Sequence, residues 1–317
     1  MYLNADTLTN KLSELAFLLK ENKPDIVGVC EVLPKNFKND IHPEYFKMEG
    51  YTIETNIHKL NETNVRGCIM YIKEGIDYKR LDINIGQKQF DEHIIIVINL
   101  SGNDKLLCST MYRRGESPDD NNEALLKTLK HITNDMKFSH LVAMGDFNIK
   151  KIDWSNQSCL SQDTNDYSNR FLECIRDSYL FQHITEPTRQ RGNDKPSTLD
   201  LVFSNEENMV NNIKYLAPLG RSDHTILNFD IICNIDTKPP QIKIQYEKGD
   251  YKKMSNHLKD IDWETELKNH PDDVDAQWLL FKEKFQDIEK ECIPQKKVYI
   301  NGKLNKKNCP HLLIKKA

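Results

Sequence analysis

The sequence predicts a mixed α/β fold of two packed mixed β-sheets flanked by helices, a four-layer α/β sandwich, with a small C-terminal helical extension. Seven or more short runs rich in β-branched residues are bounded by turn formers, as is typical of strands. Only a few amphipathic segments separate these runs, so the pattern does not fit the simple alternation of a doubly wound parallel sheet. After residue 233 the predicted strands give way to a helical, lysine-rich sequence, and the extension begins there.

The first predicted element is a helix that begins near residue 7 and ends before Pro24. Its apolar residues are spaced by 4, 3 and 4 positions and share one face: Leu8, Leu12, Leu15 and Leu19. The predicted strands follow at residues 25–30, 68–72, 94–99, 106–112, 141–144, 199–204 and 225–232. Two more helices are indicated by the apolar stripes Leu125, Leu129, Ile132 and Met136, and Phe171, Ile175 and Tyr179.

A last amphipathic helix is predicted in the extension, and it ends before Pro294. Its stripe consists of Val274, Trp278, Phe281, Phe285, Ile288 and Cys292. We expect this stripe to be buried within its own helical module or against the first domain. The chain is therefore divided into a domain at residues 1–233 and a helical, lysine-rich extension at residues 234–317.

Composition excludes several classes of protein. The 317 residues are 38% hydrophobic and 29% charged without a biased tract, which excludes a fibrous or largely disordered chain. The apolar runs are far shorter than the roughly 20 residues of a membrane helix, and the first residues lack the pattern of a secretory signal. We therefore expect an intracellular protein with no membrane partner. The eight cysteines lack zinc-ligand spacing and are expected to be reduced.

Charge is distributed unevenly along the chain. Residues 1–233 contain 27 lysines and arginines against 34 acidic residues, a net charge of −7, and residues 234–317 have 17 against 14, a net charge of +3. A negative first domain argues against tight, charge-driven nucleic-acid binding. It does not argue against a nuclease, because a metal site itself needs carboxylates.

Polar side chains stand at the boundaries of three predicted strands. Glu31 directly follows the first strand, and Asp146 and Asn148 follow the strand at 141–144, where continued alternation would direct both to one side. Asp223 and His224 precede the last strand of the domain. Together they offer oxygen ligands for Mg²⁺ or Mn²⁺, an amide and a base. The pattern predicts metal-assisted hydrolysis of a phosphodiester bond.

The order of these motifs resembles the endonuclease/exonuclease/phosphatase superfamily, which includes the apurinic/apyrimidinic endonucleases. The motifs are Asn4, Glu31, Tyr112-Arg113, the GDFN run at 145–148, Leu199-Asp200 and the SDH run at 222–224. Residues 2–233 resemble the endonuclease domain of non-LTR retrotransposon polyproteins. The segments that carry this resemblance are PDIVGVCE, CIMYIKEG, STLDLVFSN and SDHTILNF. The segment after 240, with IDWE and IPQKK, resembles the connector toward a reverse transcriptase domain, which we expect in the parent polyprotein.

The resemblance implies a role for each matching residue. The metal ion, Mg²⁺ or Mn²⁺, would have as ligands Glu31, Asn4 and Asp223. The catalytic residues would be Asp146, His224, Tyr112, Asn148 and Asp200. Either Asp146 or His224 is the base, and the sequence leaves this open, whereas Asp200 would fix the tautomer of His224. The residues implied on the substrate side are Arg113, Glu92 and Ser222.

The resemblance implies a metal-dependent DNA endonuclease that nicks one strand and leaves a 3′-hydroxyl from which a reverse transcriptase primes. Such an enzyme would act in the nucleus, although no targeting signal is visible. Two alternatives are a phosphodiesterase or phosphatase of the same fold that acts on a small, lipid or RNA phosphoester, and an inactive remnant that only binds.

The sequence departs from the family pattern at three places. Relatives usually have a pair of glycines where this chain has Arg66-Gly67, and a Tyr-Arg-Pro-Pro run where it has Tyr112-Arg113-Arg114-Gly115. Met1 lies only three residues before Asn4, so the first strand is short. A short strand could leave Asn4 poorly held and so lower metal affinity, and the sequence leaves this question open.

Overall fold

The structure is a computed structural model that describes residues 1–298, apart from residues 38, 40, 58–64, 87, 102–103, 137, 234–240 and 269–272. It divides into two compact units, Met1–Thr237 and Lys238–Ala317. Most of the predicted lysine-rich end, from residue 299 onward, lies outside the described residues. Among the described residues, no helix combines the length and apolar character that crossing a bilayer requires.

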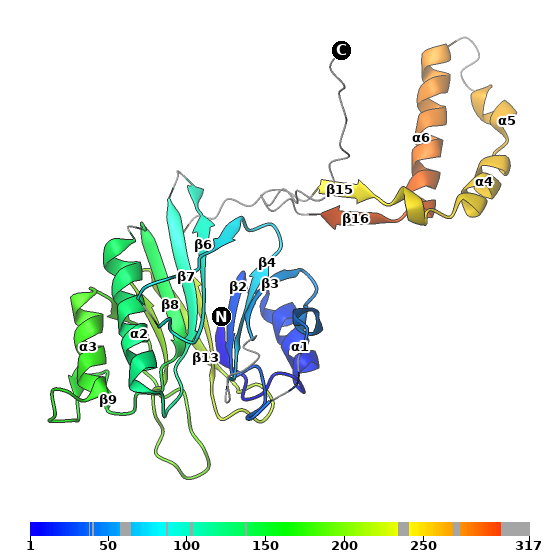
Figure 1. Cartoon of the computed structure of the whole chain (residues 1–317). Coiled ribbons are helices and arrows are strands. Elements are labelled where there is room, and N and C mark those ends of the chain that lie inside the picture. The colour runs from blue at the N-terminus through cyan, green and yellow to red at the C-terminus, as the bar shows by residue number, and fades with distance from the viewer. Residues whose placement is uncertain are drawn as a thin grey trace, which may run out of the picture. The chain divides into compact units, whose positions relative to one another are not determined.

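The first unit contains two six-stranded sheets that pack face to face (Figure 1). The first sheet has the order β13-β14-β1-β2-β4-β3. Its strands are β1 (Tyr2–Asn4), β2 (Ile26–Cys30), β3 (Tyr51–Asn56), β4 (Cys68–Lys73), β13 (Val210–Leu216) and β14 (Ile226–Ile231). The second sheet has the order β11-β12-β8-β7-β6-β5. Its strands are β5 (Tyr78–Arg80), β6 (Glu92–Asn99), β7 (Lys105–Tyr112), β8 (His140–Asp146), β11 (Phe181–Gln182) and β12 (Asp200–Ser204).

Helices cover the outer face of each sheet (Figure 1). The helix α1 (Leu12–Asn22) and the short turn η1 (Pro43–Phe46) pack on the first sheet, and α2 (Asp119–Lys130) and α3 (Tyr167–Asp177) pack on the second. A π-helical turn, η3 (His131–Asp135), continues α2, and β9 (Ile152–Asp153) pairs with β10 (Ser158–Cys159). This arrangement confirms the predicted four-layer sandwich.

The central strands form where the sequence predicted them because both of their faces are buried. In β2, Val27 and Val29 face α1, and Ile26 and Cys30 face the second sheet. Such strands are nearly continuous apolar runs and are visible in a sequence. The strands β3 and β13 at the sheet edges were missed, since their residues are mostly half-buried or exposed.

Two helix predictions were wrong at their ends. The helix α1 begins at Leu12 rather than near residue 7, because Asp6 and Thr7 adopt positive φ angles and Lys11 Nζ donates to the carbonyl of Ala5 at 2.5 Å. The apolar spacing continued through this loop because Leu8 is buried there without being helical. Tyr179 lies beyond α3, with a φ of 51° and 82% of its surface exposed.

One parallel pair of strands lies inside each sheet, β1 with β2 and β7 with β8, and all other pairs in the two sheets are antiparallel. The strands of a parallel pair end at the same edge of the sheet. The side chains that follow these ends are therefore brought together, which is where α/β proteins place ligand-binding groups.

The close approach of β7 to β8 depends on Gly145. A Cβ atom at this position would lie 2.1 Å from the carbonyl oxygen of Met111. We expect Gly145→Ala to lower the free energy of unfolding by about 3 kcal/mol, at the upper end of the usual range for overpacking. Urea unfolding would measure this, with Gly115→Ala as control, because a Cβ there would meet only Asn148 Oδ1 at 4.0 Å. An equal effect of the two substitutions would contradict the prediction.

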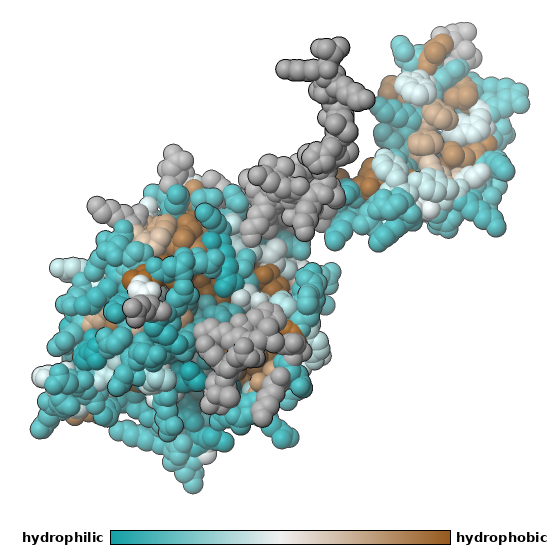
Figure 2. Space-filling model, viewed as in Figure 1, coloured by the Kyte–Doolittle hydropathy of each residue, from teal (hydrophilic) through white to brown (hydrophobic). Residues whose placement is uncertain are grey.

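The second unit is a small helical module with one two-stranded sheet. It consists of β15 (Gln241–Ile244), η4 (Tyr246–Lys248), α4 (Tyr251–Lys259), α5 (Trp263–Leu267), α6 (Val274–Cys292) and β16 (Gln295–Val298). The predicted last helix has the bounds of α6. The second half of its stripe packs on α4 around Met254 and Cys292, whereas Val274 and Trp278 remain exposed. Figure 2 shows that hydrophobic residues lie on the surface of this unit.

Candidate active site

Four predicted site residues meet where the two parallel strand pairs end. Asn4 ends β1, Glu31 follows β2, and Tyr112 and Asp146 end β7 and β8 opposite one another. Asn4 Nδ2 donates to Glu31 Oε1 at 3.1 Å and to Asp146 Oδ2 at 2.9 Å. The Tyr112 hydroxyl donates to Glu31 Oε1 at 3.0 Å. The bonds from Asn4 to Asp146 and from Tyr112 to Glu31 run between the two sheets, and all three bonds together fix both carboxylates.

Asn4 is well held, which answers the question that the short first strand had raised. Its exposed fraction is 1%, and its Oδ1 accepts the backbone N–H of Asp6 at 3.0 Å. The short strand β1 is sufficient because it lies between β2 and β14 and forms bonds on both sides.

A buried histidine and aspartate lie beside this cluster. Asp200 begins β12 directly opposite Asp146, and its Oδ2 lies 2.7 Å from His224 Nδ1. His224 Nε2 lies 4.0 Å from Asp146 Oδ2 and 3.6 Å from Asp223 Oδ1. The structure therefore brings His224 to its predicted partner Asp200 and places Asp146 and Asp223 beside it as well.

Burial and neighbouring charge shift the pKa values of this cluster. Burial opposes the charged form of His224, but the carboxylates of Asp200, Asp146 and Asp223 outweigh it and raise the pKa of the imidazole to about 10. Burial, followed by the carboxylate of Asp200, raises the pKa of Asp146. The pKa of the Tyr112 hydroxyl is also raised, by burial and by Glu31, so this phenol stays protonated at neutral pH.

The sequence suggested that strand alternation directs Asn148 to the same side as Asp146. In the structure a turn, and not alternation, brings Asn148 to the pocket. The strand β8 ends at Asp146, and Asn148 has a φ of 52°. The backbone N–H of Asn148 donates to Asp146 Oδ1 at 3.0 Å, and Asn148 Nδ2 donates to the carbonyl of Arg113 at 2.9 Å. Glu31 also has a positive φ, of 53°. Such strained residues in a cleft are typical of functional sites.

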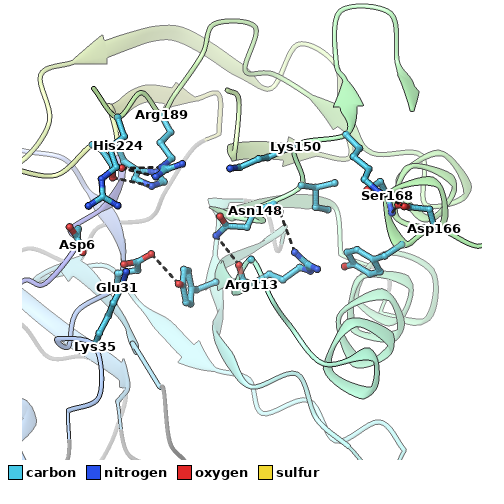
Figure 3. Close-up of a pocket in the computed structure, with 17 residues that line it drawn as sticks. Asp6, Glu31, Lys35, Arg113, Asn148, Lys150, Asp166, Ser168, Arg189 and His224 are labelled. Carbon is cyan, nitrogen blue, oxygen red and sulfur yellow. Dashed lines mark hydrogen bonds and ion pairs between the residues drawn. The ribbon is translucent and has the colours of Figure 1, made fainter. Parts of the chain in front are cut away.

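These groups surround a pocket of about 660 Å³. Of the predicted residues, Glu31, Tyr112, Asn148, Asp223 and His224 line it, as does Arg113. In Figure 3, Glu31 and Asp6 lie on one side of the pocket below His224, and Asn148 and Lys150 face them across it. Asn4, Asp146 and Asp200 are at most 1% exposed and lie outside this lining.

The three residues predicted to contact the substrate are buried and hold loops in place. Arg113 Nε donates to Asn122 Oδ1 at 2.8 Å, and its guanidinium lies 4.4 Å from the centre of the Tyr167 ring. Glu92 Oε2 accepts the backbone N–H groups of residues 66 and 67, at 3.0 and 2.6 Å. Ser222 Oγ donates to the carbonyl of Asn4 at 2.8 Å. Each of the three therefore supports a loop, and the contact with substrate that the resemblance implies for them stays a prediction.

Sequence reasoning missed the cations around the pocket. The lining includes Lys35, Lys150, Lys151, Arg189 and Arg191. Arg189 pairs with the predicted metal ligand Asp223, through Nη2 to Oδ2 at 2.9 Å. These residues lie on irregular segments without periodicity, so no local pattern marked them.

The donor set fits a divalent cation that prefers oxygen ligands. Asp146, Asp200 and His224 offer ligand atoms within 4.8 Å of one another. Asp200 Oδ1 is buried and has no hydrogen-bond partner among the described residues. Glu31 and Asp223 add carboxylates whose side chains are 14% and 21% exposed and face the pocket. Oxygen-rich sites of this kind suit Mg²⁺ or Mn²⁺.

Comparison with known proteins supports the predicted resemblance. Residues 106–228 match a family model described as endonuclease-reverse transcriptase, and this match includes all predicted site residues from Tyr112 to His224. No curated protein matches the sequence.

Several solved structures share the fold. The endonuclease domain of TRAS1, a telomere-specific non-LTR retrotransposon, is 17% identical with a TM-score of 0.54 over 73% of this chain and 95% of that one. An AP endonuclease from Archaeoglobus fulgidus is 16% identical, with a TM-score of 0.51, over 73% and 98% of the two chains. An endonuclease/exonuclease/phosphatase family protein from Leptotrichia buccalis is 18% identical, with a TM-score of 0.50, over 73% and 97%.

Proposed function

We propose that this chain, which has the fold of the endonuclease/exonuclease/phosphatase superfamily, is a divalent-metal-dependent endonuclease that nicks DNA. One observation carries the proposal: Glu31, Asp146 and the Asp200–His224 pair meet at the ends of the parallel strands, beside a pocket lined with cations. The similarity of the fold to the TRAS1 endonuclease domain and to an AP endonuclease supports the choice of DNA as substrate.

The metal ion, when bound, supplies positive charge beside the scissile phosphate and helps to activate water. Glu31 is the principal ligand in this proposal, because its carboxylate faces the pocket. Asp223 offers a second carboxylate. Asn4 donates its amide N–H groups to Glu31 and Asp146, so its contribution is to hold these two ligand groups at a fixed separation.

Asp146 is the base in this proposal, and His224 supports charge on the phosphate. The Nδ1 atom of His224 is bound to Asp200, and its Nε2 atom lies between the carboxylates of Asp146 and Asp223. An imidazole surrounded by carboxylates favours its protonated form, which donates hydrogen bonds and cannot accept a proton. Asp146 remains as the group that orients and deprotonates water.

Two further side chains would position the phosphate group. Asn148 uses one amide N–H for the carbonyl of Arg113, and its second N–H, which has no acceptor among the described residues, can donate to a phosphate oxygen. Tyr112 places its phenol at the floor of the pocket, where it also holds Glu31.

The lysines and arginines of the pocket suit a polyanionic substrate, although residues 1–233 have a net charge of −7. Lys35, Lys150 and Arg191 form no ion pair with any residue that the structure describes. They are available to contact phosphates on either side of the scissile bond. Phosphate contacts of this kind position a nucleic acid without reading its sequence.

We expect the double variant Lys150→Ala/Arg191→Ala to weaken DNA binding similarly for all sequences. The slope of log K against log salt should fall by roughly 1.8, because each phosphate contact contributes about 0.9. Titrations at several salt concentrations would measure it. The control is Lys105→Ala/Lys127→Ala, which removes the same charge outside the pocket. Equal slopes for the two double variants would contradict the assignment.

The experiment that tests the proposed function is plasmid nicking. Supercoiled plasmid with the protein and Mg²⁺ should give nicked circles, and EDTA should prevent this. Extension of the nicks by a DNA polymerase without prior phosphatase treatment would establish the 3′-hydroxyl. Hydrolysis of small phosphoesters without nicking would favour a phosphatase of the same fold, and metal binding without hydrolysis of either would favour a binding remnant.

The retrotransposon role extends this proposal. A nick that leaves a 3′-hydroxyl would supply the primer for a reverse transcriptase domain in the parent polyprotein, and this reaction would take place in the nucleus. Residues 234–317 would then be the connector to that domain. The match of residues 106–228 to the endonuclease-reverse transcriptase family model supports the retrotransposon origin of the first domain.

A further inference from the structure

A buried arginine occupies one side of the principal carboxylate of the site. Arg66 Nη2 lies 2.5 Å from Glu31 Oε2 and 2.9 Å from Asp6 Oδ1, and the Arg66 side chain is 5% exposed. The other carboxylate oxygen, Glu31 Oε1, accepts from Asn4 and Tyr112. Both oxygens of Glu31 are therefore engaged by groups of the protein itself.

The backbone fixes Arg66 in this position. Its N–H and that of Gly67 both donate to Glu92 Oε2, and its carbonyl accepts the N–H of Leu33 at 2.7 Å. Gly67 has a φ of 72°, and a Cβ there would lie 2.8 Å from the Ile57 side chain. The guanidinium is thus built into the site and is not a mobile surface group.

Asp6 gives the guanidinium a second acceptor. Its side chain is 48% exposed, and its pKa is lowered, against the effect of burial, mainly by Arg66. If Arg66 leaves Glu31, it can keep its bond to Asp6. Arg66 therefore has a carboxylate partner in either arrangement.

We propose that Arg66 is a positioning residue that holds Glu31 through a permanent positive charge and thereby lowers the affinity of the site for divalent cations. This inference rests on the proposed function, since it takes Glu31 as a metal ligand. A cation that binds Glu31 must displace the guanidinium toward Asp6 or share Oε2 with it. In both cases, a like charge lies close to the ion and opposes its binding.

The test measures Mn²⁺ binding without DNA, from the loss of the electron paramagnetic resonance signal of free Mn²⁺. We expect Arg66→Gln to bind Mn²⁺ at least tenfold more tightly than the wild type, and Arg66→Lys to bind close to the wild-type affinity. Arg80→Gln is the matched control, because Arg80 pairs with Glu54 and lies outside the pocket. Glu31→Gln should abolish Mn²⁺ binding both in the protein with Arg66 and in the Arg66→Gln variant.

A double-mutant cycle with Asp6 gives a second test of the inference. It begins with a variant that keeps Arg66, so it does not rely only on the folding of Arg66→Gln. Asp6→Asn should weaken Mn²⁺ binding when Arg66 is present, because the displaced guanidinium then lacks its second acceptor. The same change should have a smaller effect in the Arg66→Gln background. Circular dichroism and thermal unfolding with and without Mn²⁺ would establish that each variant is folded.

Equal Mn²⁺ affinity for the wild type, Arg66→Gln and Arg80→Gln would overturn the inference and leave the metal site standing. No Mn²⁺ binding by any folded variant, including Arg66→Gln, would overturn the inference together with the proposed metal site. Plasmid nicking that requires Mg²⁺ distinguishes these two failures, because it tests the proposed function without reference to Arg66.

Discussion

Glu31→Gln is expected to abolish metal-dependent cleavage and to leave the fold intact. The substitution keeps the shape of the side chain and removes the negative charge that faces the pocket. Asn4 and Tyr112 can still donate to the amide oxygen, and Arg66 keeps Asp6 as partner. We expect the nicking rate at limiting Mg²⁺ to fall by about 10³-fold or more, as when a main electrostatic contribution to a transition state is lost.

Plasmid nicking over a series of Mg²⁺ concentrations would measure this effect, and thermal unfolding would check the fold. Glu54→Gln serves as control, because Glu54 pairs with Arg80 on a sheet edge away from the pocket. Equal nicking by Glu31→Gln and the wild type at limiting Mg²⁺ would refute the assignment of Glu31 as metal ligand.

Asp146→Asn and His224→Ala should each lower turnover far more than DNA binding. A positioned general base contributes roughly 10²–10⁴ in rate, and a group that stabilises developing charge contributes a similar amount. The Nε2 of His224 lies 4.0 Å from Asp146 Oδ2, so the two residues can serve one step. The double variant should therefore lose less than the product of the two single losses.

Single-turnover cleavage at saturating DNA separates these losses from binding. His140→Ala is the control for His224→Ala, because His140 begins β8 at the end away from Asp146 and pairs with Glu206 on the surface. If the losses of the double variant multiply fully, Asp146 and His224 act in separate steps, and the proposed division of roles is wrong.

The sequence predicted those parts of the fold and site that depend on local pattern. The buried strand 26–30 is an apolar run because helices cover one face and a second sheet the other, and its end marked Glu31. The pairing of Arg66 with Glu31 could not be predicted in this way, because the partners lie in different loops far apart in the sequence. The one feature of the sequence that singled out Arg66 was its position, where relatives usually have a glycine. The turn at Asn148 could not be predicted either, because a single residue with a left-handed backbone conformation leaves no periodic pattern in the sequence.

The bonds from Asn4 to Asp146 and from Tyr112 to Glu31 join one sheet to the other. The proposed catalytic groups therefore also hold together two layers that otherwise touch mainly through apolar side chains. A small sliding of one sheet over the other would break these bonds while every strand kept its own hydrogen-bond ladder. Under mild denaturant or pressure, loss of activity should then precede loss of secondary structure. The nicking rate would therefore report on the alignment of the two sheets.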